Sequence, residues 1–147
     1  MRVVFPDGEG LLILPDPDAT AAAGAALAHI LRPGDIVALS GDLGAGKTVL
    51  ARGVAEGLGI EEGEVQSPTY TLIREHRGSG GRLVHVDLYR LDPGETEALG
   101  LEEMLAGPGV KVVEWAERLP FPVPGAKALH LARRPEGGRA IHEIDQK

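Results

Sequence analysis

The chain has 147 residues, of which 43% are hydrophobic and 3% aromatic, so we expect a single domain over residues 1–147 with a core of Val, Leu, Ile and Ala. It contains no cysteine, which excludes disulfides and thiolate sites. No stretch approaches the roughly 18 apolar residues of a membrane span, so we expect a soluble cytoplasmic protein. The formal net charge of −7 argues against tight nucleic-acid binding by this chain alone, because clustered Lys and Arg hold phosphate backbones.

The N-terminal part predicts two short strands and a helix. Residues 2–5 and 11–14 are apolar runs separated by a turn that starts at Pro6. An Ala-rich segment then predicts a helix over residues 19–31, with Asp18 as its N-cap.

Residues 41–48 fit the phosphate-binding pattern G-x-x-x-x-G-K-[ST]. The apolar run 36–40 before them predicts a buried parallel strand, and residues 49–58 after them predict a helix, which is the context that this pattern requires. Glycines let backbone N–H groups surround a triphosphate, Lys47 reaches the β- and γ-phosphates, and the Thr48 hydroxyl is placed for Mg²⁺. The candidate nucleotide-binding residues of this loop are Gly41, Asp42, Leu43, Gly44, Ala45, Gly46, Lys47, Thr48 and Val49.

The alternative for this segment is a glycine-rich turn without a ligand. The full pattern, with a predicted strand before it and a helix after it, favours the nucleotide. The chain has no asparagine, so it lacks the N-K-x-D motif that reads guanine, and we expect ATP rather than GTP.

The remaining elements alternate between strands, turns and a helix. Residues 70–76 and 82–88 predict a β-hairpin around a glycine-rich turn. A helix is expected over residues 95–105 and a strand over 110–114. The Pro-rich segment 119–125 predicts a loop, and the tail predicts a second hairpin with strands near 129–134 and 139–144.

Two carboxylates follow the pattern of strand-end partners for a phosphate loop. Asp87 and Glu114 each lie at the end of a predicted strand, where Mg²⁺ ligands and water-orienting groups are expected in a parallel sheet. Asp87 is a candidate for the Mg²⁺ shell, directly or through water, or else a solvated cap. Glu114 is a candidate Mg²⁺ ligand or general base, or else a partner of Arg118 in a salt bridge. Alternation places His85 on the same face as Asp87, where we expect a packed or hydrogen-bonded residue rather than a catalyst.

Three further features remain open on spacing alone. The hydroxyl-rich segment 67–71, with Ser67 and Thr69, is a candidate γ-phosphate sensor or an ordinary turn. Trp115, the only tryptophan, faces either the ligand or the core. The five histidines show no ligand spacing, so we expect no zinc site.

Four segments together resemble the TsaE (YjeE) family, the small bacterial ATPases required for threonylcarbamoyl modification of tRNA adenosine. They are residues 41–48, 67–72, 85–91 and 113–119, and the resemblance extends from about residue 16 to 119. Ala116 stands where many members have proline, and the tail after Leu119 matches only loosely.

The resemblance implies an α/β fold, a P-loop NTPase-like three-layer sandwich with a mainly parallel central sheet, an antiparallel hairpin and flanking helices. It implies a Mg²⁺-dependent ATPase that is slow alone and stimulated by TsaB and TsaD, with tRNA contacted only indirectly. Carried over by position, Lys47 contacts the phosphates, Thr48 and Glu114 hold Mg²⁺, and Asp87 supports metal or water. The switch falls on residues 67–71, and the start of the first helix, residues 16–20, is the candidate adenine contact.

We therefore expect an ATPase subunit whose nucleotide cycle resets a partner complex between turnovers. A small-molecule kinase is one rival, for which the hairpin arginines Arg74, Arg77 and Arg82 are the candidate lid residues. A nucleotide sensor that does not hydrolyse ATP is the other.

Overall fold

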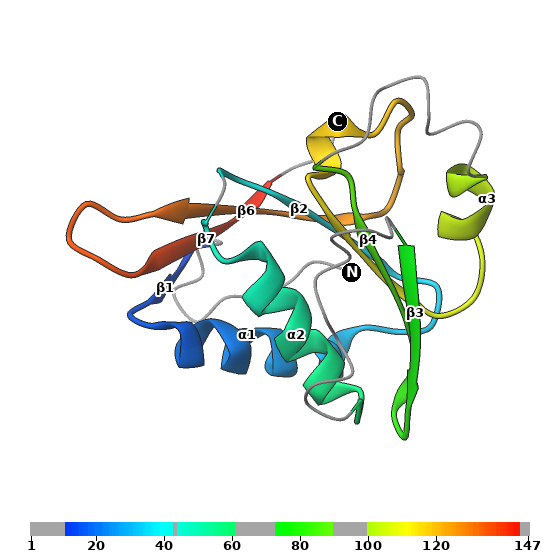
Figure 1. The fold of residues 1–147 in the computed structure, drawn as a ribbon, viewed down its shortest axis with the longest axis horizontal. Helices are drawn as coiled ribbons and strands as arrows, with labels where there is room; N and C mark the ends of the chain where they lie inside the picture. The colour runs from blue at the N-terminus through cyan, green and yellow to red at the C-terminus, as the bar shows by residue number, and fades with distance from the viewer. Residues whose placement is uncertain (1–10, 43, 61–72, 90–99, 145–147) are drawn as a thin grey trace.

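Seven strands form one mixed sheet in the part of the chain that the computed structural model describes, which is residues 11–42, 44–60, 73–89 and 100–144 (Figure 1). The strands are β1 (Leu11–Leu14), β2 (Ile36–Ser40), β3 (Ile73–Gly78), β4 (Gly81–Asp87), β5 (Val110–Glu114), β6 (Lys127–Arg133) and β7 (Arg139–Ile144). Their order across the sheet is β1-β7-β6-β2-β5-β4-β3. Strand β2 therefore lies in the middle, where both of its edges are paired.

The four central strands are parallel and the outer ones antiparallel. Strand β2 pairs in parallel with β5 and β6, and β5 pairs in parallel with β4. The β3–β4 hairpin is antiparallel, as predicted, and β7 and β1 add antiparallel pairs on the other side. Because the central strands run the same way, their carboxyl ends lie at one edge of the sheet, and this edge carries the site.

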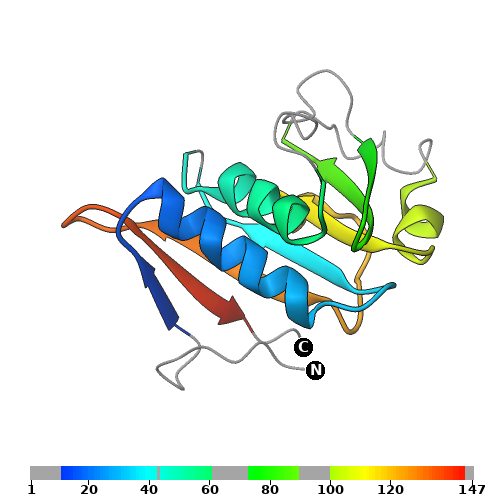
Figure 2. The ribbon, with the colours of Figure 1, turned by 90° about the horizontal axis from the view of Figure 1, so that it is seen from below.

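Helices cover both faces of the sheet, which gives the three layers that were expected. Helices α1 (Pro17–Ile30) and α2 (Lys47–Gly57) lie side by side on one face (Figure 2), and their core includes Leu50 and Val54 packed with Val37, Leu39 and Val112 of the sheet. The short helix α3 (Leu101–Leu105) packs in a second cluster with Val84, Val86 and Val113. Alternate residues of β4 and β5 thus enter opposite cores.

Several element boundaries match the sequence predictions. The strands predicted at 11–14, 36–40 and 110–114 have those bounds, and no helix or strand falls within 119–125. Helix α2 begins at Lys47 rather than at residue 49, because the last residues of the phosphate-binding pattern already form its first turn. The tail strand β6 begins earlier than predicted, at Lys127.

One predicted helix start was wrong. Helix α1 is capped by Asp16 rather than Asp18, since an oxygen of Asp16 accepts from the backbone N–H of Ala19 at 2.8 Å. Pro17 explains the shift, because proline has no N–H to satisfy and its φ suits the first helical position. Of the helix predicted over 95–105, the described part forms α3 from Leu101, after Gly100 with φ +63°. Residues 2–5, 70–72 and 95–99 of the predicted elements lie outside the described residues.

The two helices on one face touch backbone to backbone. A methyl group added at Gly53 of α2 would lie 2.1 Å from the carbonyl oxygen of Ala21 in α1. One added at Gly24 of α1 would lie 2.3 Å from the carbonyl oxygen of Leu50. Glycine is therefore required at this crossing for its size, and the contact fixes the position of α2 against α1.

We expect Gly53→Ala to destabilise the fold. Alanine has a higher helix propensity by about 1 kcal/mol, but overpacking costs up to about 3 kcal/mol where the neighbour is a backbone carbonyl, so a net loss of up to about 2 kcal/mol is expected. Urea denaturation measures the change. Arg52→Ala, at an exposed position of the same helix, is the control and should stay within about 0.5 kcal/mol of the parent. A Gly53→Ala variant as stable as the parent would contradict the close helix contact.

Candidate functional site

The phosphate-binding loop connects β2 to α2 at the carboxyl edge of the sheet. Gly41, Gly44 and Gly46 have φ of +135°, +79° and +103°, conformations that side chains rarely adopt. A methyl group at Gly41 would lie 2.2 Å from the carbonyl oxygen of Leu131 in β6. Gly46 is also the N-cap of α2, and no side chain caps the helix there. The first N–H groups of α2 thus remain available for an anion, as the sequence predicts.

Lys47 is nearly buried within this loop. Its ammonium donates to the carbonyl oxygens of Gly41 and Asp42, the latter at 2.9 Å, and its side chain is 4% exposed. Nζ also lies 4.1 Å from the centre of the Trp115 ring, within the range of a cation–π contact. Burial lowers the pKa of Lys47, while the carboxylates of Glu117 and Glu114 oppose that shift. The loop thus holds a positive charge beside the position expected for the phosphates.

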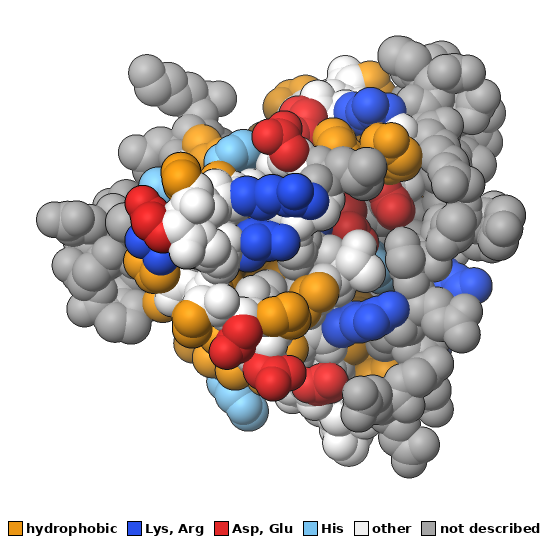
Figure 3. Space-filling view, turned by 60° about the vertical axis from the view of Figure 1, so that its left-hand side comes forward, with side chains coloured by type: hydrophobic (Ala, Val, Ile, Leu, Met, Phe, Trp, Pro, Cys, Tyr) orange, Lys and Arg blue, Asp and Glu red, His pale blue; other side chains and the backbone are white. Residues whose placement is uncertain are grey.

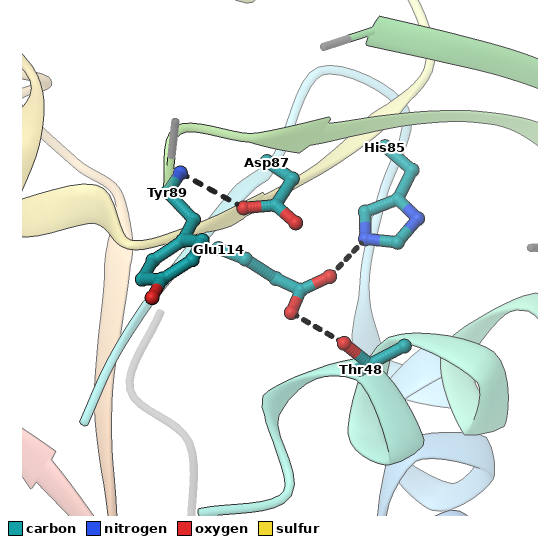
Figure 4. Close-up of polar contacts among 5 residues, drawn as sticks. All are labelled: Thr48, His85, Asp87, Tyr89 and Glu114. Carbon is teal, nitrogen blue, oxygen red and sulfur yellow. Dashed lines mark hydrogen bonds and ion pairs between the residues drawn. The ribbon is translucent and has the colours of Figure 1, made fainter. Parts of the chain in front are cut away.

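Glu114 joins the end of β5 to the first turn of α2 (Figure 4). Its Oε1 accepts a hydrogen bond from the Thr48 hydroxyl at 2.7 Å, and its Oε2 lies 2.5 Å from Nε2 of His85. Glu114 is only 2% exposed and His85 is fully buried. The alternative partner of Glu114, Arg118, instead donates to the carbonyl oxygen of Tyr89. Both oxygens of this carboxylate are therefore engaged by groups of the site.

Asp87 ends β4 directly beside Glu114, with which it is paired in the parallel register. Its Oδ1 accepts from the backbone N–H of Tyr89 at 3.0 Å, so it caps the turn that follows the strand. Burial raises the pKa of Asp87, and the nearby Glu114 carboxylate acts in the same direction, although the Tyr89 hydrogen bond opposes both. Asp87 thus caps the turn after β4 and also lies at the site.

Trp115 packs against the core, one of its two predicted environments, and also lies beside Lys47, while a ligand-facing role stays a prediction. It has φ +59°, the left-handed conformation, among the described residues the one non-glycine with positive φ. Its ring stacks at 4.9 Å on that of Tyr89, and the Arg118 guanidinium lies 5.3 Å from the Trp115 ring centre. The Trp115 side chain also packs against the second core cluster. Trp115 therefore connects Lys47 to the core.

The structure brings most of the predicted site residues together. The loop and the first turn of α2 contain Gly41, Asp42, Gly44, Ala45, Gly46, Lys47, Thr48 and Val49. At the ends of the adjacent strands lie Asp87, Glu114 and Trp115. Leu43, Ser67 and Thr69 lie outside the described residues, as does the predicted switch. His85 is a buried, hydrogen-bonded strand residue, as expected.

Sequence reasoning missed two arginines of the tail. A methyl group at Gly44 would lie 2.1 Å from Nη2 of Arg133, and one at Gly46 would lie 3.8 Å from Cγ of Arg139. Basic side chains are visible on this side of the molecule (Figure 3). Strand alternation was the available signal, because it places Arg133 on the same face of β6 as the buried Leu131. This alternation indicates a position near the loop only once β6 is known to lie next to β2.

The start of α1 also lies beside the loop. Thr20 is 1% exposed, and its Cγ2 would lie 3.7 Å from a methyl group at Gly46. This is the segment assigned to adenine in the sequence, and that assignment stays a prediction.

The donors at this edge fit Mg²⁺ better than a softer metal. Thr48, Glu114 and Asp87 supply a hydroxyl and two carboxylates, and Mg²⁺ is typically held by one or two carboxylates together with phosphates and water. No group of three or more His, Cys, Asp or Glu side chains placed to hold a metal occurs in the described residues. Phosphate oxygens would therefore be needed to complete the coordination.

Comparison with known proteins identifies relatives across most of the chain. The model of the family described as "Threonylcarbamoyl adenosine biosynthesis protein TsaE" matches residues 14–141. The tRNA threonylcarbamoyladenosine biosynthesis protein TsaE of Bacillus subtilis is 45% identical over 119 residues, which cover 81% of this chain and 74% of that protein. The protein of the same name from Streptomyces coelicolor is 54% identical over 98 residues, covering 64% of this chain and 65% of that one.

A solved structure agrees with these sequence matches. The crystal structure of Bacillus subtilis YdiB superposes with a TM-score of 0.70 at 33% identity, covering 90% of this chain and 82% of that one.

In the described part of the chain, no helix has both the length and the apolar character to span a bilayer.

We expect Asp87→Asn to raise the melting temperature at neutral pH. The pKa of Asp87 is raised in the folded state, so ionised Asp87 opposes folding, and stability falls as pH rises through this pKa. Asparagine removes the charge and keeps an oxygen for the Tyr89 N–H. The gain should be a few degrees and should shrink at a pH that protonates Asp87. Calorimetry at both pH values measures it, with Glu56→Gln at an exposed site as the control. A lower melting temperature at neutral pH would contradict the burial argument.

Proposed function

This chain belongs to the TsaE family and acts in tRNA threonylcarbamoyladenosine biosynthesis, and we propose that it does so as a Mg²⁺-dependent ATPase subunit. The single observation that carries the proposal is the hydrogen bond of 2.7 Å from Thr48 to Glu114 beside the glycine loop. It joins a phosphate-loop hydroxyl to a strand-end carboxylate, which is the pairing that a metal–nucleotide site needs.

The residues of the loop would hold the triphosphate. Backbone N–H groups of the loop and of the first turn of α2 donate to phosphate oxygens. Lys47 exchanges its carbonyl partners at Gly41 and Asp42 for the β- and γ-phosphates. The Thr48 hydroxyl would keep its hydrogen bond to Glu114 and would offer its oxygen to Mg²⁺. Bound Mg²⁺ would neutralise the charge that develops on the transferred phosphoryl group.

The two carboxylates have different surroundings, which supports different roles. Glu114 is 2% exposed and has both oxygens engaged, so it is suited to hold Thr48 and the metal in place. Asp87 is half-buried, and its Oδ1 is held by Tyr89. We assign Asp87 to the orientation of the attacking water, with a contribution to the metal shell through water.

The partner part of the proposal follows from the family and the charge. We propose that hydrolysis is slow in the isolated chain and is stimulated by TsaB- and TsaD-like proteins in the cytoplasm. The net charge of −7 supports contact with tRNA through those proteins rather than directly. Loss of the γ-phosphate would reset the complex between turnovers.

Two of the three hairpin arginines give the kinase alternative no support. Arg77 and Arg82 pair across the sheet at the end of the β3–β4 hairpin, whereas Asp87 lies at the opposite end of β4. Arg82 also forms an ion pair with Glu75 at 2.5 Å. These two residues are therefore remote from the phosphate loop and are not placed as a lid over it.

Lys47→Ala is expected to abolish ATP binding. The side chain supplies the buried positive charge of the loop, and no neighbour in the described loop replaces it. Titration calorimetry gives the Kd for ATP, because its signal does not depend on the Lys47 side chain. Arg77→Ala, at the exposed end of the hairpin, is the matched control and should bind ATP as the parent does. Unchanged affinity in Lys47→Ala would contradict the assignment of the loop.

Asp87→Ala and Glu114→Ala should lower turnover more than affinity. Each removes a group that acts on metal or water, while the backbone of the loop still holds the triphosphate. Phosphate release in the presence of purified partner proteins gives kcat, and titration calorimetry gives the Kd for ATP. If ATP stayed intact with wild-type protein and partners together, the hydrolytic part of the proposal would fail and a nucleotide sensor would replace it.

A further inference from the structure

A fully buried histidine contacts the central carboxylate of the site, and neither the sequence patterns nor the family comparison assigns it a role. Strand alternation in β4 directs His85 to the face that α2 covers, where it lies beside Val112 of β5 in the parallel register. Its exposure is 0%, and Nε2 lies 2.5 Å from Oε2 of Glu114 (Figure 4). On β3 the residue paired with it is Arg74.

The surroundings of the imidazole select one tautomer. An ionised carboxylate only accepts hydrogen bonds, so the proton between His85 and Glu114 belongs to Nε2. Nδ1 is buried and has no hydrogen-bond partner among the described residues. Nε2–H is therefore the group that donates to Glu114.

The carboxylate of Glu114 is consequently held at both oxygens. His85 donates to Oε2 and the Thr48 hydroxyl donates to Oε1. Removing the His85 donor would leave Oε2 buried without a partner and would free the carboxylate to turn. Thr48 would then lose its fixed acceptor.

We propose that His85 is a positioning residue that fixes the Glu114 carboxylate through Nε2–H and thereby orients Thr48 for the metal–nucleotide complex. The hydrogen bond stands on the geometry alone, whereas its consequence for turnover rests on the proposed function. Partners that orient metal ligands in this way contribute about 10- to 100-fold to metal affinity or activity.

Two substitutions separate positioning from packing. The amide nitrogen of His85→Gln reaches the place of Nε2 and can donate to Glu114, whereas the shorter side chain of His85→Asn cannot. We expect His85→Asn to lower kcat and Mg²⁺-dependent ATP affinity about 10- to 100-fold, with ATP affinity in EDTA unchanged. His85→Gln should stay within about threefold of the parent, because the donor is restored. Equal losses in two folded variants, or no loss in His85→Asn, would overturn the proposal.

The tautomer is tested in the wild-type protein without nucleotide. Long-range ¹H–¹⁵N NMR of the histidine side chains should show His85 protonated at Nε2, and a proton on Nδ1 alone would overturn the proposal. This measurement uses the wild-type protein, so it requires neither ATPase activity nor a variant that folds. A wild-type protein with the expected tautomer but no hydrolysis would leave the His85 contact intact and refute the ATPase function.

Discussion

The hydrogen bond between Thr48 and Glu114 is the contact on which the site depends, because it joins two elements that are 66 residues apart in sequence. Parallel pairing creates this proximity. In the register of β2 and β5, Leu39 lies beside Glu114, so the chain leaves β2 for the phosphate loop next to that carboxylate. In the register of β4 and β5, Asp87 lies on its other side. Hydrophobic strands thus determine where the polar groups meet.

The polar groups of this cluster are buried, so each of them needs a hydrogen-bond partner. Lys47, His85 and Glu114 are each at most 4% exposed, and an unpaired polar group in such a place is costly. Each of the three has partners within the loop or on the adjacent strand. Glu114 is held at both oxygens, so it needs little rearrangement when a ligand binds, which is the basis of preorganisation. The site is therefore supported by the same packing that holds the sheet together.

Local patterns in the sequence were sufficient for the loop, the strands around it and the two strand-end carboxylates. The run 36–40, the glycines of the loop and the alternation around Asp87 each carry their own signal. Strand order does not, because it depends on packing between distant segments. The neighbours of β2 were therefore not predictable from pattern, and Arg133 was missed together with them. The Asp16 cap was missed for a local reason, since proline at the next position moved the helix start.

The glycine crossing between α1 and α2 has a mechanical consequence. With backbone against backbone, the two helices have no layer of side chains that can slip, so they behave as one rigid body. The N-terminus of α2 is then a fixed reference at the site, and Thr20 of α1 belongs to the same body beside Gly46. The packing opposes a piston-like sliding of α2 past α1, because the two backbones already touch. If the loop binds ATP as proposed, the helix pair would provide a stationary frame for the ligand.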